Sequence, residues 1–389
     1  MRILPFTECV DLVGSTCKAF EGEKQYISTG AVDTDHIDYA DIEIIDYNGK
    51  PSRANLEVNA GDVLFAKMQG TKKTLLIDEE LANNVYSTGF CAVRARNDIL
   101  ITKCLYHLLT SKMFLTQKDR NCSGATQKAI TNAGLNKIVL QIPDIKAQES
   151  IAVQLDIITS IIAKRQRELS VLDELIKARF VEMFGDPRNN NRYEYVPFES
   201  IVGYMGDIGS NGANKVVVEH LDMKDEEDYA LMVRFLNFTK NDFSEDVKYI
   251  SKESYDFFKK SQLHGGELII CKIGSAGLNY VMPYLNRPVS LGLNQIMVRI
   301  NNKVLMPYLY QYLHTDYGEF LIESCINGAV TKSITKTELK KIPVLLPPMD
   351  EQKAFQDFIA QVDKSKAAVR KSLDENQKLF DSLMQQYFG

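Results

Sequence analysis

The stretch LKKIPVLLPPMDEQKAF at 339–355 repeats a pattern that already stands at 135–151 as LNKIVLQIPDIKAQESI. Offsetting the chain by 204 residues superimposes the two stretches, because residue 135 then falls on residue 339. The same offset carries Phe184-Gly185 onto Phe388-Gly389. Internal repeats should be sought before any other fold assignment, and this one is far longer than a solenoid repeat. The sequence therefore predicts two tandem copies of one larger unit.

The similarity continues upstream, where GDVLFAKMQG at 61–70 resembles GELIICKIGS at 266–275. Near the start, LPFTECV at 4–10 resembles VPFESIV at 196–202, which is a smaller offset. The second copy therefore carries an insertion of about a dozen residues in its globular part. Both copies mix short β-type runs with glycine turns and one short amphipathic helix. This mixture predicts an α+β fold with a pseudo-two-fold internal repeat.

Composition restricts the class of protein. A chain of 389 residues with 45% hydrophobic and 25% charged residues supports two or three ordinary domains. We expect a cytoplasmic protein with no membrane partner, because no run of 18 apolar residues and no signal-peptide pattern occurs. The seven cysteines are scattered and never spaced C-x-x-C, which favours reduced thiols over zinc ligands or disulfides. A net charge of -5 means that any DNA-binding surface must be local or completed by another subunit.

Two long segments show heptad spacing. In each of them apolar residues recur in alternating steps of four and three, sustained over about five heptads, which is typical of a coiled coil. Arg165 and Arg179 interrupt the first seam, whereas Lys366 and Asn376 interrupt the second at different heights. Differently placed interruptions favour two helices that pair with each other, antiparallel, over two helices that each pack on their own domain. The predicted packing residues are Ile151, Leu155, Ile158, Ile162, Leu169, Leu172, Ile176, Phe355, Ile359, Val362, Val369, Leu373, Phe380 and Leu383.

Polar loops precede each long helix. The stretch 111–137 is rich in Lys, Ser, Thr, Asn and Gln, and INGAVTKSITKTELKK at 326–341 repeats this composition. Phosphates and base edges are contacted by such side chains, although a loop of this kind is also often only a solvated loop. The glycine turns after residues 66 and 271 have the same ambiguity. The candidate DNA contacts are Lys67, Lys72, Lys73, Lys118, Arg120, Gln127, Lys128, Lys272, Asn327, Lys332 and Lys336.

Motifs for catalysis are missing from the sequence. It contains no phosphate-binding loop G-x-x-x-x-G-K-[ST], no H-E-x-x-H zinc motif and no G-x-S-x-G nucleophile elbow. An adenine methyltransferase would carry an Asp/Asn-Pro-Pro-aromatic tetrapeptide, and LPPMD at 346–350 has only the two prolines. We therefore predict a chain that is not an enzyme and has no metal site, no catalytic residue and no cofactor of its own.

Two variable units, each closed by an I-P-x-x-x-x-Q type boundary and a long helix ending in Phe-Gly, resemble the DNA-specificity subunit of type I restriction-modification systems. The stretch LPPMDEQKAF is similar to the second boundary of that family, while Ala147-Gln148-Glu149 departs from the usual Glu-Gln-Lys or Glu-Gln-Arg at the first. The resemblance covers essentially the whole chain. It implies target recognition domains at 1–145 and 187–348, each followed by a spacer helix, at 146–186 and 349–389.

The resemblance also implies a function. Each recognition domain would read one half of a bipartite, asymmetric target in double-stranded DNA, and the helices would set the unread spacer. Two methyltransferase subunits and the restriction-translocation subunits would be the partners, and S-adenosylmethionine, ATP and magnesium would belong to them. Three alternatives remain open from the residues: a specificity subunit of a system whose restriction and methylation functions are fused, a self-contained modification enzyme, and a coiled-coil scaffold that does not bind DNA.

Overall fold

The computed structural model describes residues 1–125 and 127–389 of the chain. It divides into two compact units, of which the first comprises Met1–Arg167 with Val369–Gly389 and the second comprises Glu168–Ala368. Each unit therefore takes in one part of each long helix. Thr126, inside the predicted contact loop 111–137, lies outside the described residues.

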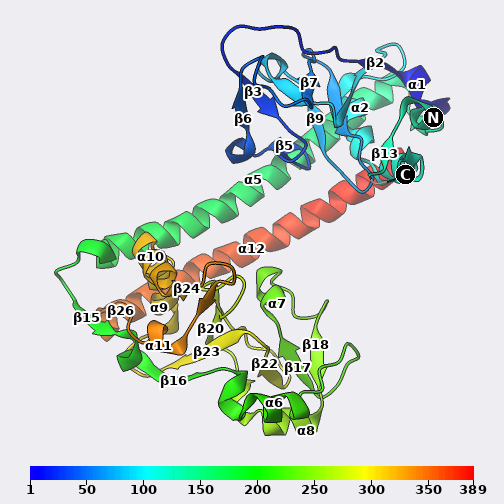
Figure 1. Cartoon of the computed structure of the whole chain (residues 1–389). Helices are drawn as coiled ribbons and strands as arrows, with labels where there is room; N and C mark the ends of the chain where they lie inside the picture. The colour runs from blue at the N-terminus through cyan, green and yellow to red at the C-terminus, as the bar shows by residue number, and fades with distance from the viewer. Residues whose placement is uncertain (126) are drawn as a thin grey trace. The chain divides into compact units, whose positions relative to one another are not determined.

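The first unit is built on two four-stranded sheets, a two-stranded ribbon and two small hairpins (Figure 1). One sheet has the order β6-β3-β10-β7, formed by Glu43–Ile45, Lys24–Ile27, Val85–Ser87 and Ala54–Leu56. The other has the order β2-β11-β8-β9, formed by Val10–Val13, Phe90–Ala95, Val63–Ala66 and Thr74–Leu76. The ribbon pairs β1 (Arg2–Pro5) with β14 (Val139–Ile142). The hairpins are β4 (Val32–Asp33) with β5 (His36–Ile37), and β12 (Cys122–Ser123) with β13 (Ala129–Ile130). The helices α1 to α4 are Phe6–Cys9, Thr102–Thr110, Lys112–Arg120 and Asn132–Leu135.

The second unit repeats the two four-stranded sheets, the ribbon and the hairpin β12-β13 of the first unit. Its sheets have the orders β18-β17-β22-β19 and β16-β23-β20-β21. Their strands are Lys248–Ile250, Ala230–Val233, Val289–Leu291 and Gln262–Leu263, then Val202–Gly206, Gln295–Ile300, Leu268–Cys271 and Asn279–Val281. The ribbon β15-β26 and the hairpin β24-β25 are Glu194–Pro197 with Pro343–Leu346 and Ile326–Asn327 with Ser333–Ile334. The helices α6 to α11 are Asn214–His220, Phe235–Thr239, Lys252–Phe257, Met306–Leu313, Asp316–Ser324 and Lys336–Leu339.

The predicted insertion lies between the first two sheet strands of the second unit. Ten residues join β2 to β3, whereas 23 residues join β16 to β17. The additional residues form the 3₁₀ turn η5 (Ile208–Asn211) and helix α6. The first unit has the hairpin β4-β5 where the second has α7. The α+β fold with an internal repeat is therefore confirmed, and the differences are confined to connections.

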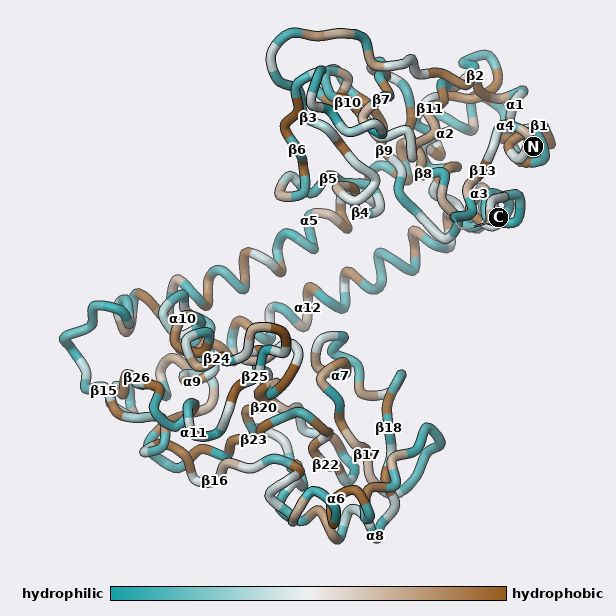
Figure 2. Tube along the Cα trace, in the orientation of Figure 1, coloured by the Kyte–Doolittle hydropathy of each residue, from teal (hydrophilic) through white to brown (hydrophobic). Residues whose placement is uncertain are grey.

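The strands β8 and β20 are apolar on both faces. All four residues of β8 and all four of β20 are buried, as expected for strands covered on both sides. In the first unit, the rings of Phe6, Phe65 and Phe114 pack together between sheet and helices, with centroids 5.3 to 6.4 Å apart. Figure 2 shows the hydrophobic stretches along β20 and β22 in the second unit and the alternating character of the long helices. Burial of these strands fixes where the sheet-end loops emerge.

The two long helices are α5 (Ile145–Phe184) and α12 (Met349–Phe388). In the first unit, the start of α5 packs with the end of α12, and the Tyr387 hydroxyl donates to Gln154 Oε1 at 2.8 Å. In the second unit, the end of α5 packs with the start of α12, where the Phe180 and Phe355 rings lie 5.5 Å apart. Pairing start with end in both units makes the helices antiparallel, which confirms the predicted coiled coil.

The predicted packing residues lie on the inner sides of these helices. Ile151, Leu155, Ile158, Ile176, Phe355, Val362 and Val369 are buried, and Ile162, Leu169, Leu172, Ile359, Leu373, Phe380 and Leu383 are half-buried. Lys366, an interruption in the seam, is buried and forms an ion pair with Asp173. The sequence interpretation missed Phe180, Phe184, Met384 and Phe388, which are buried in the globular cores. The repeat offset of Phe184 onto Phe388 was the signal that could have identified them.

The boundary glutamine of the repeat fixes the start of each long helix. Gln148 is fully buried, and its Oε1 accepts from the backbone N–H of Ile101 at 2.9 Å. Its Nε2 donates to the carbonyl oxygens of Ile99 and Pro143, both at 2.8 Å. The side chain thus satisfies the open N-terminus of α2 and the turn before α5 at once.

Gln352 makes the same three bonds in the second unit. Its Oε1 accepts from Leu305 N at 2.8 Å, and its Nε2 donates to Lys303 O at 3.2 Å and Pro347 O at 2.9 Å. A buried amide side chain is stable only when such partners are present. These partners account for the glutamine that both copies of the motif share at this position.

Candidate nucleic-acid interface

Two donor-rich segments of the first unit meet at one end of a sheet. The backbone N–H of Ile130 donates to the Lys67 carbonyl at 2.9 Å, and that of Gln69 donates to the Lys128 carbonyl at 3.0 Å. These bonds join the turn between β8 and β9 to the hairpin β12-β13. We call residues 67–73, 122–125 and 127–132 the first loop cluster. Candidates that are some 60 positions apart in the sequence thus belong to one surface.

Most candidate side chains of this region are accessible. Lys72, Arg120, Gln127 and Lys128 are exposed, and Lys67 is half-buried. Among the described residues, no ion pair involves Lys67, Lys72, Arg120 or Lys128. The ammonium group of Lys73 is used internally, because it donates to the Thr29 carbonyl at 2.7 Å. The first loop cluster therefore presents uncompensated positive charge, as a phosphate-binding surface requires.

Lys118 must be removed from the predicted contacts. Its side chain is 1% exposed, and its Nζ donates to the Met68 carbonyl at 2.8 Å and contacts Asp119 Oδ1 at 2.9 Å. The same Asp119 oxygen accepts from the backbone N–H of Gly70 at 3.1 Å. A buried lysine with these partners cannot reach a ligand. Through its bond to the Met68 carbonyl, Lys118 instead fixes the turn 67–73 of the first loop cluster.

The second unit assembles its candidates in the same way. Ile334 N donates to the Lys272 carbonyl at 3.0 Å, and Gly274 N donates to the Lys332 carbonyl at 3.2 Å. We call residues 272–278 and 326–336 the second loop cluster. Lys332 and Asn327 are exposed, and the Asn327 amide donates to the Cys325 carbonyl at 3.2 Å. Lys67 and Lys272 occupy equivalent strand ends, as do Lys128 and Lys332 on the hairpins.

Two lysines of the second loop cluster share one carboxylate that sequence reasoning missed. Lys272 Nζ lies 2.9 Å from Asp207 Oδ2, and Lys336 Nζ lies 3.0 Å from Asp207 Oδ1. Burial alone would raise the pKa of Asp207, but the hydrogen bonds from both lysines outweigh it and lower the pKa to about 2. The carboxylate therefore stays ionised at neutral pH. No signal in the repeat could have revealed Asp207, since it begins the inserted connection.

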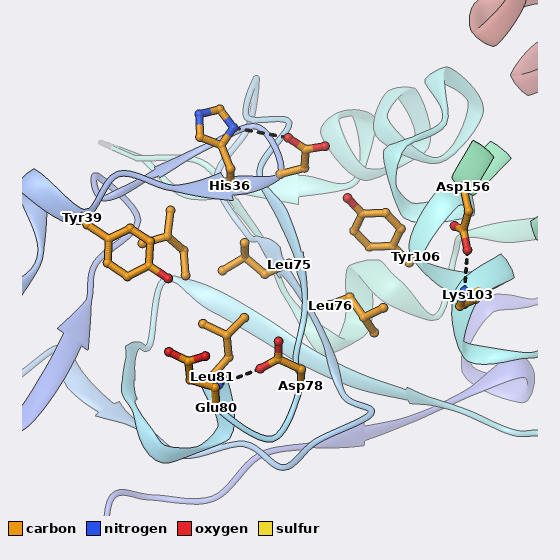
Figure 3. Close-up of a pocket in the computed structure, with 12 residues that line it drawn as sticks. His36, Tyr39, Leu75, Leu76, Asp78, Glu80, Leu81, Lys103, Tyr106 and Asp156 are labelled. Carbon is orange, nitrogen blue, oxygen red and sulfur yellow. Dashed lines mark hydrogen bonds and ion pairs between the residues drawn. The ribbon is translucent and has the colours of Figure 1, made fainter. Parts of the chain in front are cut away.

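A pocket in the first unit has the opposite character. Figure 3 shows it between the β4-β5 hairpin, strand β9 and helix α2. Its lining includes the carboxylates of Asp35, Asp78, Glu80 and Asp156, and the last of these forms an ion pair with Lys103. A concentration of carboxylates repels phosphate. The candidate DNA surface is therefore the loop cluster and not this pocket.

Within residues 1–125 and 127–389, no group of three or more His, Cys, Asp or Glu side chains is placed to hold a metal ion. All seven cysteines are free thiols, of which Cys9, Cys17, Cys104, Cys271 and Cys325 are buried. No helix in this described part of the chain has the length and apolar character needed to cross a membrane.

The sequence matches the family described as the type I restriction modification DNA specificity domain, once at residues 12–172 and again at 205–377. The chain belongs to this family. Each match contains one loop cluster and most of the helix that follows it. The repeat detected in the sequence is therefore a repeat of this domain.

Individual proteins show the same relationship at low identity. The specificity subunit of the type I restriction enzyme HindI from Haemophilus influenzae is 28% identical over 41% of this chain and 35% of its own length. The chain spans about a third of the length of the curated relatives it matches. The type I S subunit from M. genitalium shares the fold, with a TM-score of 0.56 at 13% identity over 100% of this chain and 96% of that one. A structure describing assembly of a type I R-M system has a TM-score of 0.55 at 18% identity, over 99% of this chain and 97% of that one.

Proposed function

We propose that this chain is the DNA-specificity subunit of a type I restriction-modification system. In this role it is not an enzyme, and it directs methyltransferase and restriction-translocation subunits to a bipartite, asymmetric site in double-stranded DNA. The observation that carries the proposal is the duplicated loop cluster. Two divergent units of one fold each present lysines and amides at the same strand ends, which suits two different half-sites better than one continuous site.

Each unit has a separate task in this proposal. The first unit contacts one half-site through Lys67, Lys72, Gln127 and Lys128 of the first loop cluster and through Arg120 at the end of α3, and the second loop cluster contacts the other half-site. Two methyltransferase subunits bind the chain, and S-adenosylmethionine, ATP and magnesium are bound by the partner subunits. The chain shares its fold with a protein whose structure concerns complex assembly of a type I R-M system. Since the target is the DNA of the cell, the complex works in the cytoplasm.

Methylated-adenine mapping tests the proposal. Genomic DNA is sequenced from cells that express the chain with its adjacent methyltransferase, and from the same cells without the chain. We expect a two-part motif with an unread gap that disappears on deletion. No change in the motif, with a soluble and expressed methyltransferase, would favour the scaffold alternative. A single partner that both cuts and methylates would identify the fused system instead.

The spacer role of the helices has its own test. Seven residues are inserted between Arg167 and Glu168 in α5, and seven between Ala368 and Val369 in α12, so that both antiparallel helices are lengthened together. At 1.5 Å per residue this adds about 10 Å, close to three base pairs. We expect the gap in the motif to change, or methylation to stop, while the half-site sequences remain. Altered half-sites with the original gap would contradict the spacer role.

A further inference from the structure

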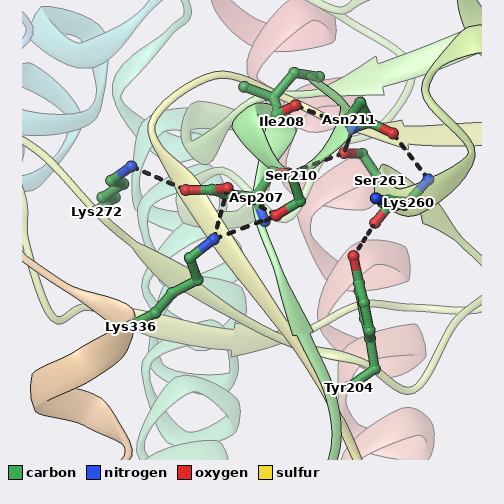
Figure 4. Close-up of polar contacts among 9 residues, drawn as sticks. All are labelled: Tyr204, Asp207, Ile208, Ser210, Asn211, Lys260, Ser261, Lys272 and Lys336. Carbon is green, nitrogen blue, oxygen red and sulfur yellow. Dashed lines mark hydrogen bonds and ion pairs between the residues drawn. The ribbon is translucent and has the colours of Figure 1, made fainter. Parts of the chain in front are cut away.

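The carboxylate of Asp207 accepts hydrogen bonds from three neighbouring side chains (Figure 4). Its Oδ2 accepts from Lys272, while its Oδ1 accepts from Lys336 at 3.0 Å and from the Ser210 hydroxyl at 3.0 Å. The residue is 7% exposed. A carboxylate can recognise cytosine by accepting from its N4 amine, but only if an oxygen is free and accessible. Asp207 therefore does not read a base itself.

The backbone of Asp207 is held independently of the lysines. Its N–H donates to Ser210 Oγ at 3.1 Å, and its carbonyl accepts from the Ser261 hydroxyl at 3.3 Å. Ser261 in turn accepts from the Asn211 amide at 2.6 Å. These bonds connect the end of β16, the turn η5 and the 3₁₀ turn η6 (Lys259–Ser261). The carboxylate is thus a fixed point onto which flexible lysine side chains converge.

The two lysines keep donors for a ligand. An ammonium group has three N–H donors. Lys272 directs one to Asp207, while Lys336 directs donors to Asp207 and to Ser210 Oγ at 3.2 Å. Both lysine side chains are 36% exposed, so their remaining donors are accessible. Two cations around one anion leave a net positive charge on an ordered group.

We propose that Asp207 is a positioning residue for the second half-site. It orders the ammonium groups of Lys272 and Lys336 as one rigid pair of donors toward acceptor atoms of DNA, and it suppresses their non-specific attraction to phosphate. This inference rests on the proposed function. The acceptors are the O6 and N7 edge of guanine or phosphate oxygens, which share the same chemistry.

The first unit is built without such a residue. The pairing of β2 with β11 and of β16 with β23 sets Gly14 at the position of Asp207. Gly14 has φ +93°, and a Cβ there would lie 2.7 Å from Leu56 Cδ1. An aspartate at this site would adopt a strained backbone and displace the Leu56 side chain. Among the described residues, the ordering of a strand-end lysine by a carboxylate is therefore seen in the second unit and not at Lys67.

The test uses Asp207→Asn in the full chain bound to its methyltransferase. Two readouts are taken: methylation of every single-base variant of the motif, and DNA affinity as a function of salt. Lys272→Met first identifies which half-site belongs to the second unit. In Asp207→Asn we expect discrimination between bases to weaken about tenfold in that same half-site. Discrimination in the other half-site should not change. Affinity for non-specific DNA rises, and the logarithmic salt slope steepens by about 1, because a lysine is released to phosphate.

Control variants separate positioning from folding. Glu267→Gln removes the charge of another buried carboxylate of the same sheet, which is 3% exposed and pairs with Arg299. It lowers stability but leaves the salt slope and base preference unchanged. Asp207→Glu retains the charge and restores the slope. Loss of preference at one base in Asp207→Asn identifies a guanine contact, and uniform weakening across the half-site identifies phosphate.

Two different results would overturn the role of Asp207 and the proposed function, respectively. A folded Asp207→Asn complex that binds all DNA more weakly with an unchanged slope would make Asp207 purely structural and would overturn the inference. A wild-type complex that yields no two-part motif would instead overturn the proposed function, whatever the behaviour of Asp207.

Discussion

The first and second loop clusters are the same backbone arrangement anchored by opposite charges. In the first loop cluster, the buried cation Lys118 holds the turn after β8 through the Met68 carbonyl. Lys67 in the same turn has no ion-pair partner within the described residues. The second unit has Ile322 at the position equivalent to Lys118. In the second loop cluster, the anion Asp207 instead holds the side chain of Lys272 through an ion pair. The residue that orders a loop cluster can therefore differ in charge from one unit to the other, while both clusters keep exposed lysines. A duplicated domain can change the ordering residue while keeping the lysines.

The parts that did not diverge are equally informative. Gln148 and Gln352 make equivalent bonds, and the N-caps Thr131 and Thr335 precede equivalent short helices, α4 and α11. These groups fix the junction between each loop cluster and its long helix. Junctions are therefore shared, and contact surfaces differ.

The largest effect is expected from breaking a junction. Gln148→Leu and Gln352→Leu each remove three hydrogen bonds to buried or part-buried backbone groups, at about 3 kcal/mol in the free energy of unfolding. Because the bonds are equivalent, we expect the two losses to be similar. Urea denaturation measures them, and hydrogen exchange assigns each loss to its own unit.

Gln361→Leu is the matched control for this pair of variants, since Gln361 is exposed on α12. It should alter stability by less than about 0.5 kcal/mol. A large difference between Gln148→Leu and Gln352→Leu would show that the two junctions are not energetically equivalent, despite their shared geometry.

A smaller loss is expected when the first anchor is replaced by its counterpart. Lys118→Ile introduces the residue type found at position 322 and removes the bonds to the Met68 carbonyl and to Asp119. We expect about 1–3 kcal/mol of destabilisation and faster exchange of the Gly70 amide. Only the half-site read by the first unit should lose discrimination. Equal loss in both half-sites would contradict separate anchoring.

Salt dependence compares the charges that the two surfaces present. Lys67→Gln and Lys272→Gln alter equivalent strand ends, but only Lys272 already has a carboxylate partner. We expect Lys67→Gln to flatten the logarithmic salt slope by about 1 and Lys272→Gln by less than half as much. Binding is measured on full-length target DNA between low and physiological salt. Equal changes would mean that Asp207 does not compensate Lys272 in the complex.

The features that could be predicted from the sequence are those that produce an internal repeat or a regular spacing of apolar residues. The offset of 204 and the heptad seams predicted two long helices, which are α5 and α12, and the short β-type runs predicted strands in both units. The candidate lysines other than Lys118 fall in loop clusters that the fold brings together. These features succeed because each depends on spacing along the chain.

Burial and partner choice were not predictable in this way. Lys118 looked like its exposed neighbours, because one turn of a short helix decides whether a side chain points into the core. Asp207 has no counterpart in the first copy, and its partners are 65 and 129 positions away. Long-range polar contacts leave no local pattern. Only the folded chain reveals them.

The smallest effect concerns His107, whose counterpart in the second unit is Gln311. His107 is 2% exposed and contacts Asp156 Oδ1 at 2.8 Å. Burial lowers its pKa from 6.5, against the hydrogen bond and charge of Asp156, which favour the protonated form. The unfolded chain therefore takes up a proton at this site before the folded chain does. Stability must fall as the pH drops below about 6.5, by at most about 1.4 kcal/mol per pH unit.

His107→Gln introduces the side chain of the second unit and removes this titration. We expect the variant to lose less stability than the wild type between pH 7 and pH 5, measured by urea denaturation. The other four histidines are present in both proteins, so the difference isolates His107. Asp156 stays ionised in this range, because hydrogen bonds from Lys103 and His107 lower its pKa even though burial raises it. Identical losses in both proteins would mean that His107 is protonated as readily in the folded unit as in the unfolded chain.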